Sequence, residues 1–211
     1  MGIKKYTPRE QFVNSLTHLP GVVLSVVGTF VLVANSKNAV QAIATAIFGV
    51  SLFLLFLSSV FYHSATDDDR VKFFQKIDHS AIYILIAGTY TPGLLFTVKF
   101  PFDVVMLSMI WILAILGIIF TCVSLKSKIL STGLYLLMGW VSLIFFKDIW
   151  ATSHLTLWLF LAGGAFYSLG CGFYLSKSRY MHSVWHLFVL AGAATHFFAI
   201  LELLRVINLG N

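Results

Sequence analysis

Charged residues are scarce in this sequence. Asp, Glu, Lys and Arg together make up 10% of the 211 residues, whereas 59% are hydrophobic. Soluble domains carry about 25% charged residues, so this composition excludes a chain that presents a water-facing surface around a single core. Lipid must be the solvent for most of the chain. We therefore expect one compact helical domain built from membrane spans of about 20 residues each.

Cysteine is nearly absent as well. The only two, Cys122 and Cys171, lie in apolar stretches, stand apart from each other and lack the spacing of metal ligands. We interpret both as small buried hydrophobic residues, which indicate nothing about the redox compartment. The first 17 residues contain no apolar core and no secretory cleavage site, so we expect no removal of a signal peptide.

Seven apolar runs, separated by short polar breaks, cover most of the chain. They fall at about 18–35, 40–62, 77–98, 102–125, 129–146, 155–175 and 183–204. Helices satisfy their own backbone hydrogen bonds within hydrocarbon, and none of these runs shows the alternation of a membrane barrel strand. The sequence therefore predicts an all-α membrane protein, a bundle of seven transmembrane helices.

The distribution of Lys and Arg predicts the orientation of the bundle. Ten of the 14 basic residues fall in the N-terminal segment and in every second break, and four fall on the opposite side. By the positive-inside rule, the side with ten is cytoplasmic. We expect a cytoplasmic N-terminal segment at 1–17, a transmembrane domain at 18–206 and an extracytoplasmic tail at 207–211. The basic residues behind the net charge of +6 then face anionic lipid headgroups. The expected partners are therefore membrane lipids and not nucleic acid.

Ionisable side chains gather at the predicted cytoplasmic ends of three spans. His63 ends the second span, Asp78 opens the third, and His182 and His186 open the seventh. The spacing of four residues places the last two imidazoles on one helical face. Two histidines at a helix end can simply face headgroups and water. The convergence of three segments at one membrane depth, where ionisable groups are costly, favours a metal site.

The residue types at this convergence indicate which metal and which chemistry. Three neutral imidazoles, His63, His182 and His186, favour zinc and leave a fourth position for a water molecule that zinc acidifies. Asp78 is the catalytic candidate that orients this water or takes its proton, as in metal-assisted hydrolysis. Ser59 lies one turn before His63 and is a second catalytic candidate, which fixes a ligand or its water or else bonds to its own helix.

These motifs resemble a known family. The pattern S-x-x-x-H at Ser59 to His63, Asp78 opening a helix that continues to AGTYTP, and H-x-x-x-H at His182 and His186 are similar to the progestin and adipoQ receptor superfamily, bacterial hemolysin III branch. The entry segment resembles the family's first motif through Glu10, Asn14, His18 and Gly21, so the likeness runs from about residue 10 to 200. The resemblance implies seven helices, an inside N-terminus, and a zinc ion held by the three histidines with Asp78 near a zinc-bound water. It also implies kinship with membrane hydrolases that cut lipid amide bonds, ceramidases among them.

Two functions of different classes follow from this reading. The first is a zinc-dependent intramembrane hydrolase of a lipid amide or ester, in the plasma membrane of a bacterium. The alternative is a non-catalytic sensor or receptor with structural zinc, although the long N-terminal regulatory domain of the eukaryotic receptors is lacking. A chain with seven obligate spans cannot be released as a soluble toxin, so lysis would be an effect of overexpression. A transporter is disfavoured because no line of ionisable groups crosses the spans.

Most other histidines and one acidic run are placed outside the candidate site. We interpret Asp67 to Asp69 as an exposed acidic loop and His154 as a solvated residue. His79 follows Asp78 directly, and adjacent residues on a helix point about 100° apart, so we place His79 outside the site. His196 lies about 15 Å further along its helix than the metal site and should make a buried hydrogen bond. His18 remains a candidate for the network at the inner face. The sequence predicts neither a particular substrate nor an oligomeric state.

Overall fold

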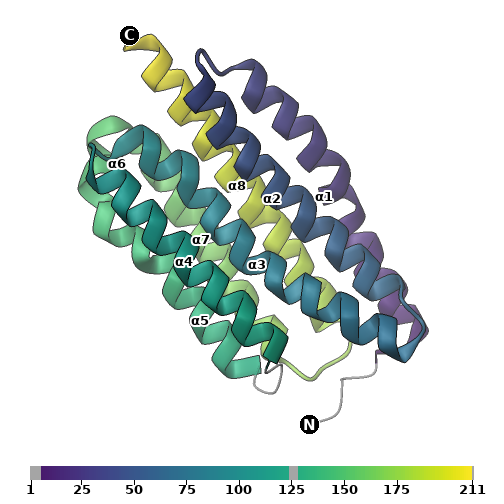
Figure 1. The fold of residues 1–211 in the computed structure, drawn as a ribbon. Coiled ribbons are helices and arrows are strands. Elements are labelled where there is room, and N and C mark those ends of the chain that lie inside the picture. Colours follow the sequence, from purple (N-terminus) through teal and green to yellow (C-terminus); the bar gives the residue numbers. More distant parts are fainter. Residues whose placement is uncertain (1–5, 124–127, 211) are drawn as a thin grey trace.

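The structure is a computed structural model that describes residues 6–123 and 128–210, and the regular structure within these ranges is helical (Figure 1). The helices are α1 (Pro8–Ala34), α2 (Ala39–Ser64), α3 (Asp68–Thr97), α4 (Phe102–Val123), α5 (Lys128–Trp140), the 3-10 helix η1 (Val141–Phe145), α6 (Phe146–Thr152), α7 (His154–Leu175) and α8 (Met181–Leu209). In the described ranges, seven spans are long and apolar enough to cross a membrane, with α5, η1 and α6 forming one of them. The predicted all-α bundle of seven spans is confirmed.

The first helix begins well before the first apolar run. Thr7 and Glu10 form a reciprocal capping box, in which the amide of Thr7 donates to Oε2 of Glu10 at 2.9 Å and the amide of Glu10 donates to Oγ1 of Thr7 at 3.3 Å. Pro8 occupies the first turn, where its missing amide hydrogen costs nothing. Helix α1 therefore starts at Pro8, and its polar first turns lie at the end of the bundle that carries the N-terminus.

The acidic run between the second and third spans begins helix α3, so its prediction as a loop is wrong for Asp68 and Asp69, whereas Asp67 lies just before the helix. The side chain of Asp67 caps α3 by accepting from the amides of Asp69 and Arg70. Asp68 and Asp69 follow in the first turn, where negative charge is favourable beside the positive end of the helix dipole. The predicted exposure of these three aspartates is confirmed.

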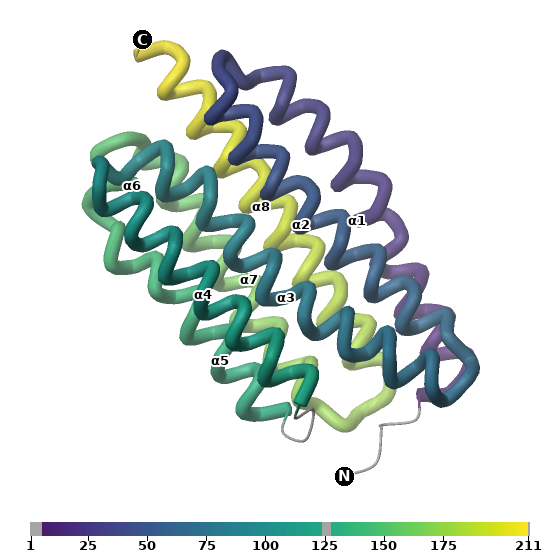
Figure 2. Tube along the Cα trace, viewed as in Figure 1, coloured from purple at the N-terminus to yellow at the C-terminus, as the bar shows by residue number. Residues whose placement is uncertain are grey.

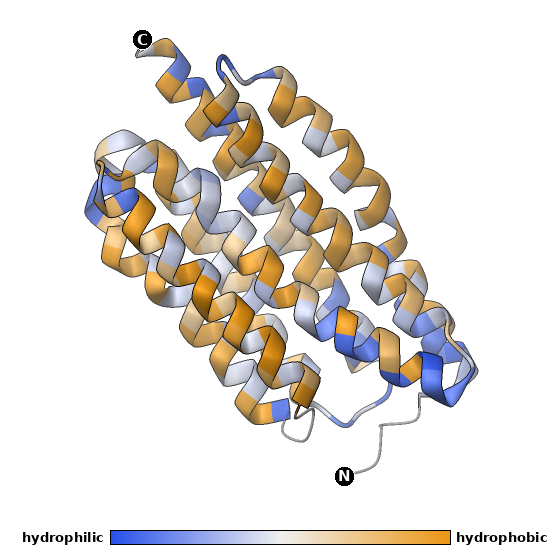
Figure 3. Cartoon of the chain, in the orientation of Figure 1, coloured by the Kyte–Doolittle hydropathy of each residue, from blue (hydrophilic) through white to orange (hydrophobic). Residues whose placement is uncertain are grey.

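Hydrophobic residues make up most of the helices, and strongly hydrophilic residues gather toward the ends of the bundle (Figure 3). Many large apolar side chains are exposed, whereas many polar side chains are buried. Along α4, Ile115, Leu116 and Ile119 are each more than half exposed. Exposed apolar side chains are unfavourable in water. In a bilayer they are favourable, because the surface facing the hydrocarbon then carries no polar groups without hydrogen-bond partners. The same pattern explains the cysteines: Cys171 is buried as predicted, but Cys122 lies exposed on α4, so the prediction of its burial is wrong.

The order of the helices brings the first and last spans together. Consecutive helices pack side by side from α1 to α4, α7 packs on α8, and α8 closes against α1 (Figure 2). One buried apolar cluster joins α1, α2, α3 and α8, and a second joins α3 and α4 with the α5–α6 span and α7. The end of α2 and the start of α8 consequently meet at one end of the bundle, next to the first turns of α1.

We expect a reporter enzyme fused after Asn211 to lie outside the cytoplasm. The physical reason is the excess of basic residues at the N-terminal end of the bundle, some of which (Lys4, Lys5 and Lys126) lie outside the described residues. The two termini lie at opposite ends of the bundle, in agreement with an odd number of spans (Figure 1). A paired alkaline phosphatase and β-galactosidase fusion measures this. Cytoplasmic reporter activity at that position would reverse the orientation.

Candidate metal centre

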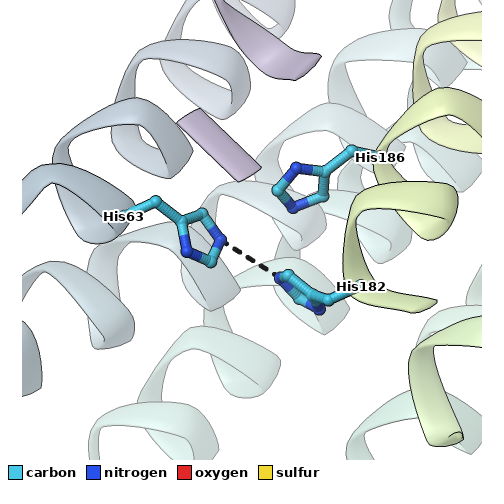
Figure 4. A group of neighbouring side chains, drawn as sticks. All are labelled: His63, His182 and His186. Carbon is cyan, nitrogen blue, oxygen red and sulfur yellow. Dashed lines mark hydrogen bonds between the residues drawn. The ribbon is translucent and has the colours of Figure 1, made fainter. Parts of the chain in front are cut away.

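Three buried histidines meet at the N-terminal end of the bundle. His63 lies in the last turn of α2, and His182 and His186 lie on successive turns at the start of α8. Figure 4 shows the three imidazoles facing one another, with His63 on one side and the α8 pair on the other. One ligand atom of each side chain lies within 4.8 Å of the others, and the side chains are 3%, 7% and 1% exposed, respectively. This cluster could hold a metal ion.

Oxygen atoms of α1 orient two of the three imidazoles. Nδ1 of His186 lies 3.0 Å from the carbonyl oxygen of Asn14, and Nδ1 of His63 lies 2.6 Å from Oε1 of Gln11. Both oxygens only accept hydrogen bonds, so these two contacts assign the hydrogen of each ring to Nδ1. The longer contact of 3.4 Å between Nδ2 of Asn14 and Nδ1 of His63 is then not a hydrogen bond, because both atoms would be donors. The lone pair of each ring is then on Nε2. Such a partner behind the ring is the usual support of a metal-binding histidine.

One nitrogen–nitrogen distance in the cluster is close to the distance expected between two ligands of one small cation. Nε2 of His182 lies 3.1 Å from Nε2 of His63, and it donates to that lone pair in this arrangement (Figure 4). Two nitrogens bound to one tetrahedral zinc at about 2.0–2.1 Å would lie roughly 3.3–3.4 Å apart. Nδ1 of His182 has no hydrogen-bond partner among the described residues, so it is available to take the hydrogen when Nε2 binds a cation. The donor set therefore fits zinc.

Asp78 and Ser59 lie next to each other beside the cluster. The hydroxyl of Ser59, one turn before His63 on α2, lies close to the carboxyl of Asp78 on α3. Both residues line the same cavity as His182 and His186. Asp78 is not one of the side chains whose ligand atoms group within 4.8 Å. The arrangement places a carboxyl and a neighbouring hydroxyl near two of the candidate ligands.

The cavity leads from the cluster into the bundle. Its volume is about 170 Å³, and away from the histidine end its lining is mostly apolar, with residues such as Leu55, Ile86, Leu136, Trp140, Phe160 and Val189. On α3 the lining extends from Asp78 to Leu94, which corresponds to about 24 Å of helix. A polar group at the cluster could thus be continuous with a hydrocarbon chain inside the protein.

Tyr6 covers the cluster at the end of the bundle. Its ring centroid lies 5.1 Å from that of His182 and 5.9 Å from that of His63. Burial raises the pKa of the Tyr6 phenol, and the carboxyls of Asp78 and Glu10 raise it further, so the phenol stays neutral. Neither Tyr6 nor Gln11 was among the predicted site residues. Both lie in a polar segment in which no periodic pattern distinguishes them.

The other histidines are outside the group of three. His18 is buried and stacks on His186 with ring centroids 3.7 Å apart, next to the cluster as its prediction allowed. His79 contacts the hydroxyl of Tyr174 through Nε2 at 3.3 Å. His154 is exposed and stacks on a tryptophan. His196 donates from Nε2 to a backbone carbonyl at 3.2 Å, so the predicted buried hydrogen bond is confirmed.

Known proteins resemble this chain over most of its length. The model of the family described as Haemolysin-III related matches residues 6–197. Hemolysin-3 of Bacillus cereus is 42% identical over 200 residues, covering 92% of this chain and 91% of that protein, and the Hemolysin-3 homolog of Bacillus subtilis (strain 168) is 42% identical over 202 residues, covering 93% and 95%. Monocyte to macrophage differentiation factor of Homo sapiens is 30% identical over 207 residues, covering 94% of this chain and 86% of its own.

Proposed function

This chain belongs to the haemolysin-III-related family and is a multi-pass membrane protein of bacterial type, and from that premise we propose that it binds zinc and hydrolyses an amide or ester bond of a membrane lipid. One observation carries the proposal. Two of the three clustered histidines, His182 and His186, line a mostly apolar cavity, with Asp78 and Ser59 in the same lining. A polar head and a hydrocarbon tail are what such a cavity accommodates.

In this proposal, His63, His182 and His186 hold the zinc ion through their neutral imidazoles. Zinc with three protein ligands lowers the pKa of water in its fourth position to about 7 and polarises carbonyl groups, which is the chemistry that hydrolysis needs. The chain itself supplies the orientation. Asn14 and Gln11 hold two of the rings by their Nδ1 hydrogens, so that Nε2 is the nitrogen presented to the ion.

Asp78 acts in the proposed reaction as the group that accepts a proton from the attacking water and later returns it to the leaving group. A carboxyl can serve both steps because its ionised form accepts a proton and its protonated form donates one. The hydroxyl of Ser59 fixes the direction of the carboxyl. The apolar lining beyond the site holds the lipid chain and excludes bulk water from the reacting bond.

A second candidate is a sensor in which zinc is structural. The observation that favours it is the closure of the cluster, because all three histidines are buried and Tyr6 covers them. A metal ion between His63 on α2 and the α8 pair would fasten the two helices together. Lysis, which the names of two relatives imply for those proteins, would be for this chain an effect of overexpression in either case.

Metal removal tests the proposal directly. Protein purified in mild detergent should contain about one zinc per chain by elemental analysis, as three ligands of one site require. It should release fatty acid from an N-acyl lipid or a phospholipid, measured by mass spectrometry. Dialysis against a chelator should lower the release to the uncatalysed background, and added zinc should restore it. Bound zinc without turnover of either lipid would favour the sensor, and protein without zinc would contradict both functions.

A further inference from the structure

His182 is held differently from the other two histidines of the cluster. His63 and His186 each donate from Nδ1 to an oxygen atom of α1, but Nδ1 of His182 has no hydrogen-bond partner in the described part of the chain. Its ring lies instead among aromatic rings. The centroids of Tyr6 and Tyr174 are 5.1 Å and 5.8 Å away. Packing against these rings must therefore orient the His182 imidazole, whereas hydrogen bonds from Nδ1 orient the other two imidazoles.

Of these two tyrosines, Tyr6 comes from the segment that precedes α1, and this segment is attached to the start of α8. Oε1 of Glu10 accepts from the amide of Tyr180 at 3.4 Å, while Oε2 of the same carboxyl accepts from Thr7. Tyr180 has a φ of 59°, in the left-handed region, immediately before α8 begins. The Glu10 carboxyl thus links Thr7, the residue after Tyr6, to the turn that precedes α8 and His182.

We propose that Tyr6 is a positioning residue, whose ring holds the imidazole of His182 in its metal-binding orientation and closes the cluster at the N-terminal end of the bundle. This inference rests on the proposed zinc site but not on hydrolysis. Without the Tyr6 ring, the His182 imidazole is held only by its Nε2 contact with His63, because its Nδ1 has no partner in the described residues. The ring can then adopt more orientations, and this freedom is lost again when the ion binds. The same loss opens a path for water and for departure of the ion.

The rate at which a water-soluble chelator extracts zinc tests this role. In zinc-loaded Tyr6→Ala we expect extraction at least about tenfold faster than in the parent and an affinity about 10- to 100-fold weaker, as for other supports of metal ligands. Tyr6→Phe keeps the ring and should stay within about twofold of the parent in both quantities. Phe12→Ala is the matched control, because Phe12 is an α1 aromatic that is 67% exposed on the outer face. It should behave as the parent.

Each outcome decides the proposal. Extraction from Tyr6→Phe as fast as from Tyr6→Ala would assign the role to the hydroxyl and overturn the inference, as would equal rates in all four proteins. A parent without zinc would overturn the inference together with the proposed function, whereas equal rates from loaded protein overturn the inference alone. Thermal unfolding without zinc should be similar for Tyr6→Ala and the parent and should differ only after loading. If Tyr6→Ala does not fold, Glu10→Gln is measured in its place. This variant keeps the Tyr6 ring but weakens the contacts of Glu10 with Thr7 and Tyr180. A rate of zinc extraction equal to that of the parent would contradict the proposal.

Discussion

Replacing His63, His182 or His186 with alanine should remove most of the zinc from the purified protein. Loss of a group that merely supports a ligand weakens metal binding about 10- to 100-fold, so loss of a ligand should weaken it by at least the upper value. Three ligands leave no substitute, since the nearest other imidazole, His18, is stacked on His186. Zinc content after dialysis against a weak chelator should fall from about one equivalent to about a tenth or less in each variant.

Two further histidines provide the controls for these variants. His154→Ala changes an exposed residue at the opposite end of the bundle. His79→Ala changes a residue that lines the same cavity and contacts Tyr174, yet is outside the group of three. Both variants should retain about a full equivalent of zinc. If the three ligand variants also retained it, the cluster would be only a set of histidines that stabilises the helix ends.

The seven spans were predictable because a run of about 20 apolar residues has one solution in hydrocarbon, the helix. The ends of the helices were less predictable, because they depend on single capping contacts and not on hydropathy. Thr7 and Glu10 extend α1 into a polar segment, and Asp67 turns an acidic run into the first turn of α3. The span that begins at Lys128 contains a 3-10 segment in its middle, which no periodicity indicated.

The meeting of the three histidines was predictable from two independent patterns. Basic residues gave the direction of each span, and the four-residue spacing placed His182 and His186 on one face. The residues that orient the rings were not predictable in the same way. Gln11 and Tyr6 act through one side-chain contact each, from a segment whose position depends on how α1 closes against α8. The partner of Ser59 likewise depends on the packing of α2 on α3.

Asp78→Asn should separate zinc binding from turnover. Asparagine keeps the shape of the side chain but cannot accept a proton, so the proposed base is lost while the three histidines remain. Removal of a general base lowers the rate about 10²- to 10⁴-fold. The variant should therefore retain about one zinc per chain, as the parent does, and lose nearly all fatty-acid release. Elemental analysis, thermal unfolding and lipid product analysis on both proteins measure the three quantities.

The control is Asp69→Asn, the same chemical change on the same helix. Asp69 is exposed in the first turn of α3 and pairs with Lys72 at 3.3 Å, remote from the cavity lining, so its loss should leave zinc content and turnover unchanged. A structural site predicts a different result for Asp78→Asn. If Asp78 closes the zinc coordination as a fourth ligand, the substitution should lower zinc content and thermal stability together. That result, with no lipid product from the parent protein, would replace the hydrolase with the sensor.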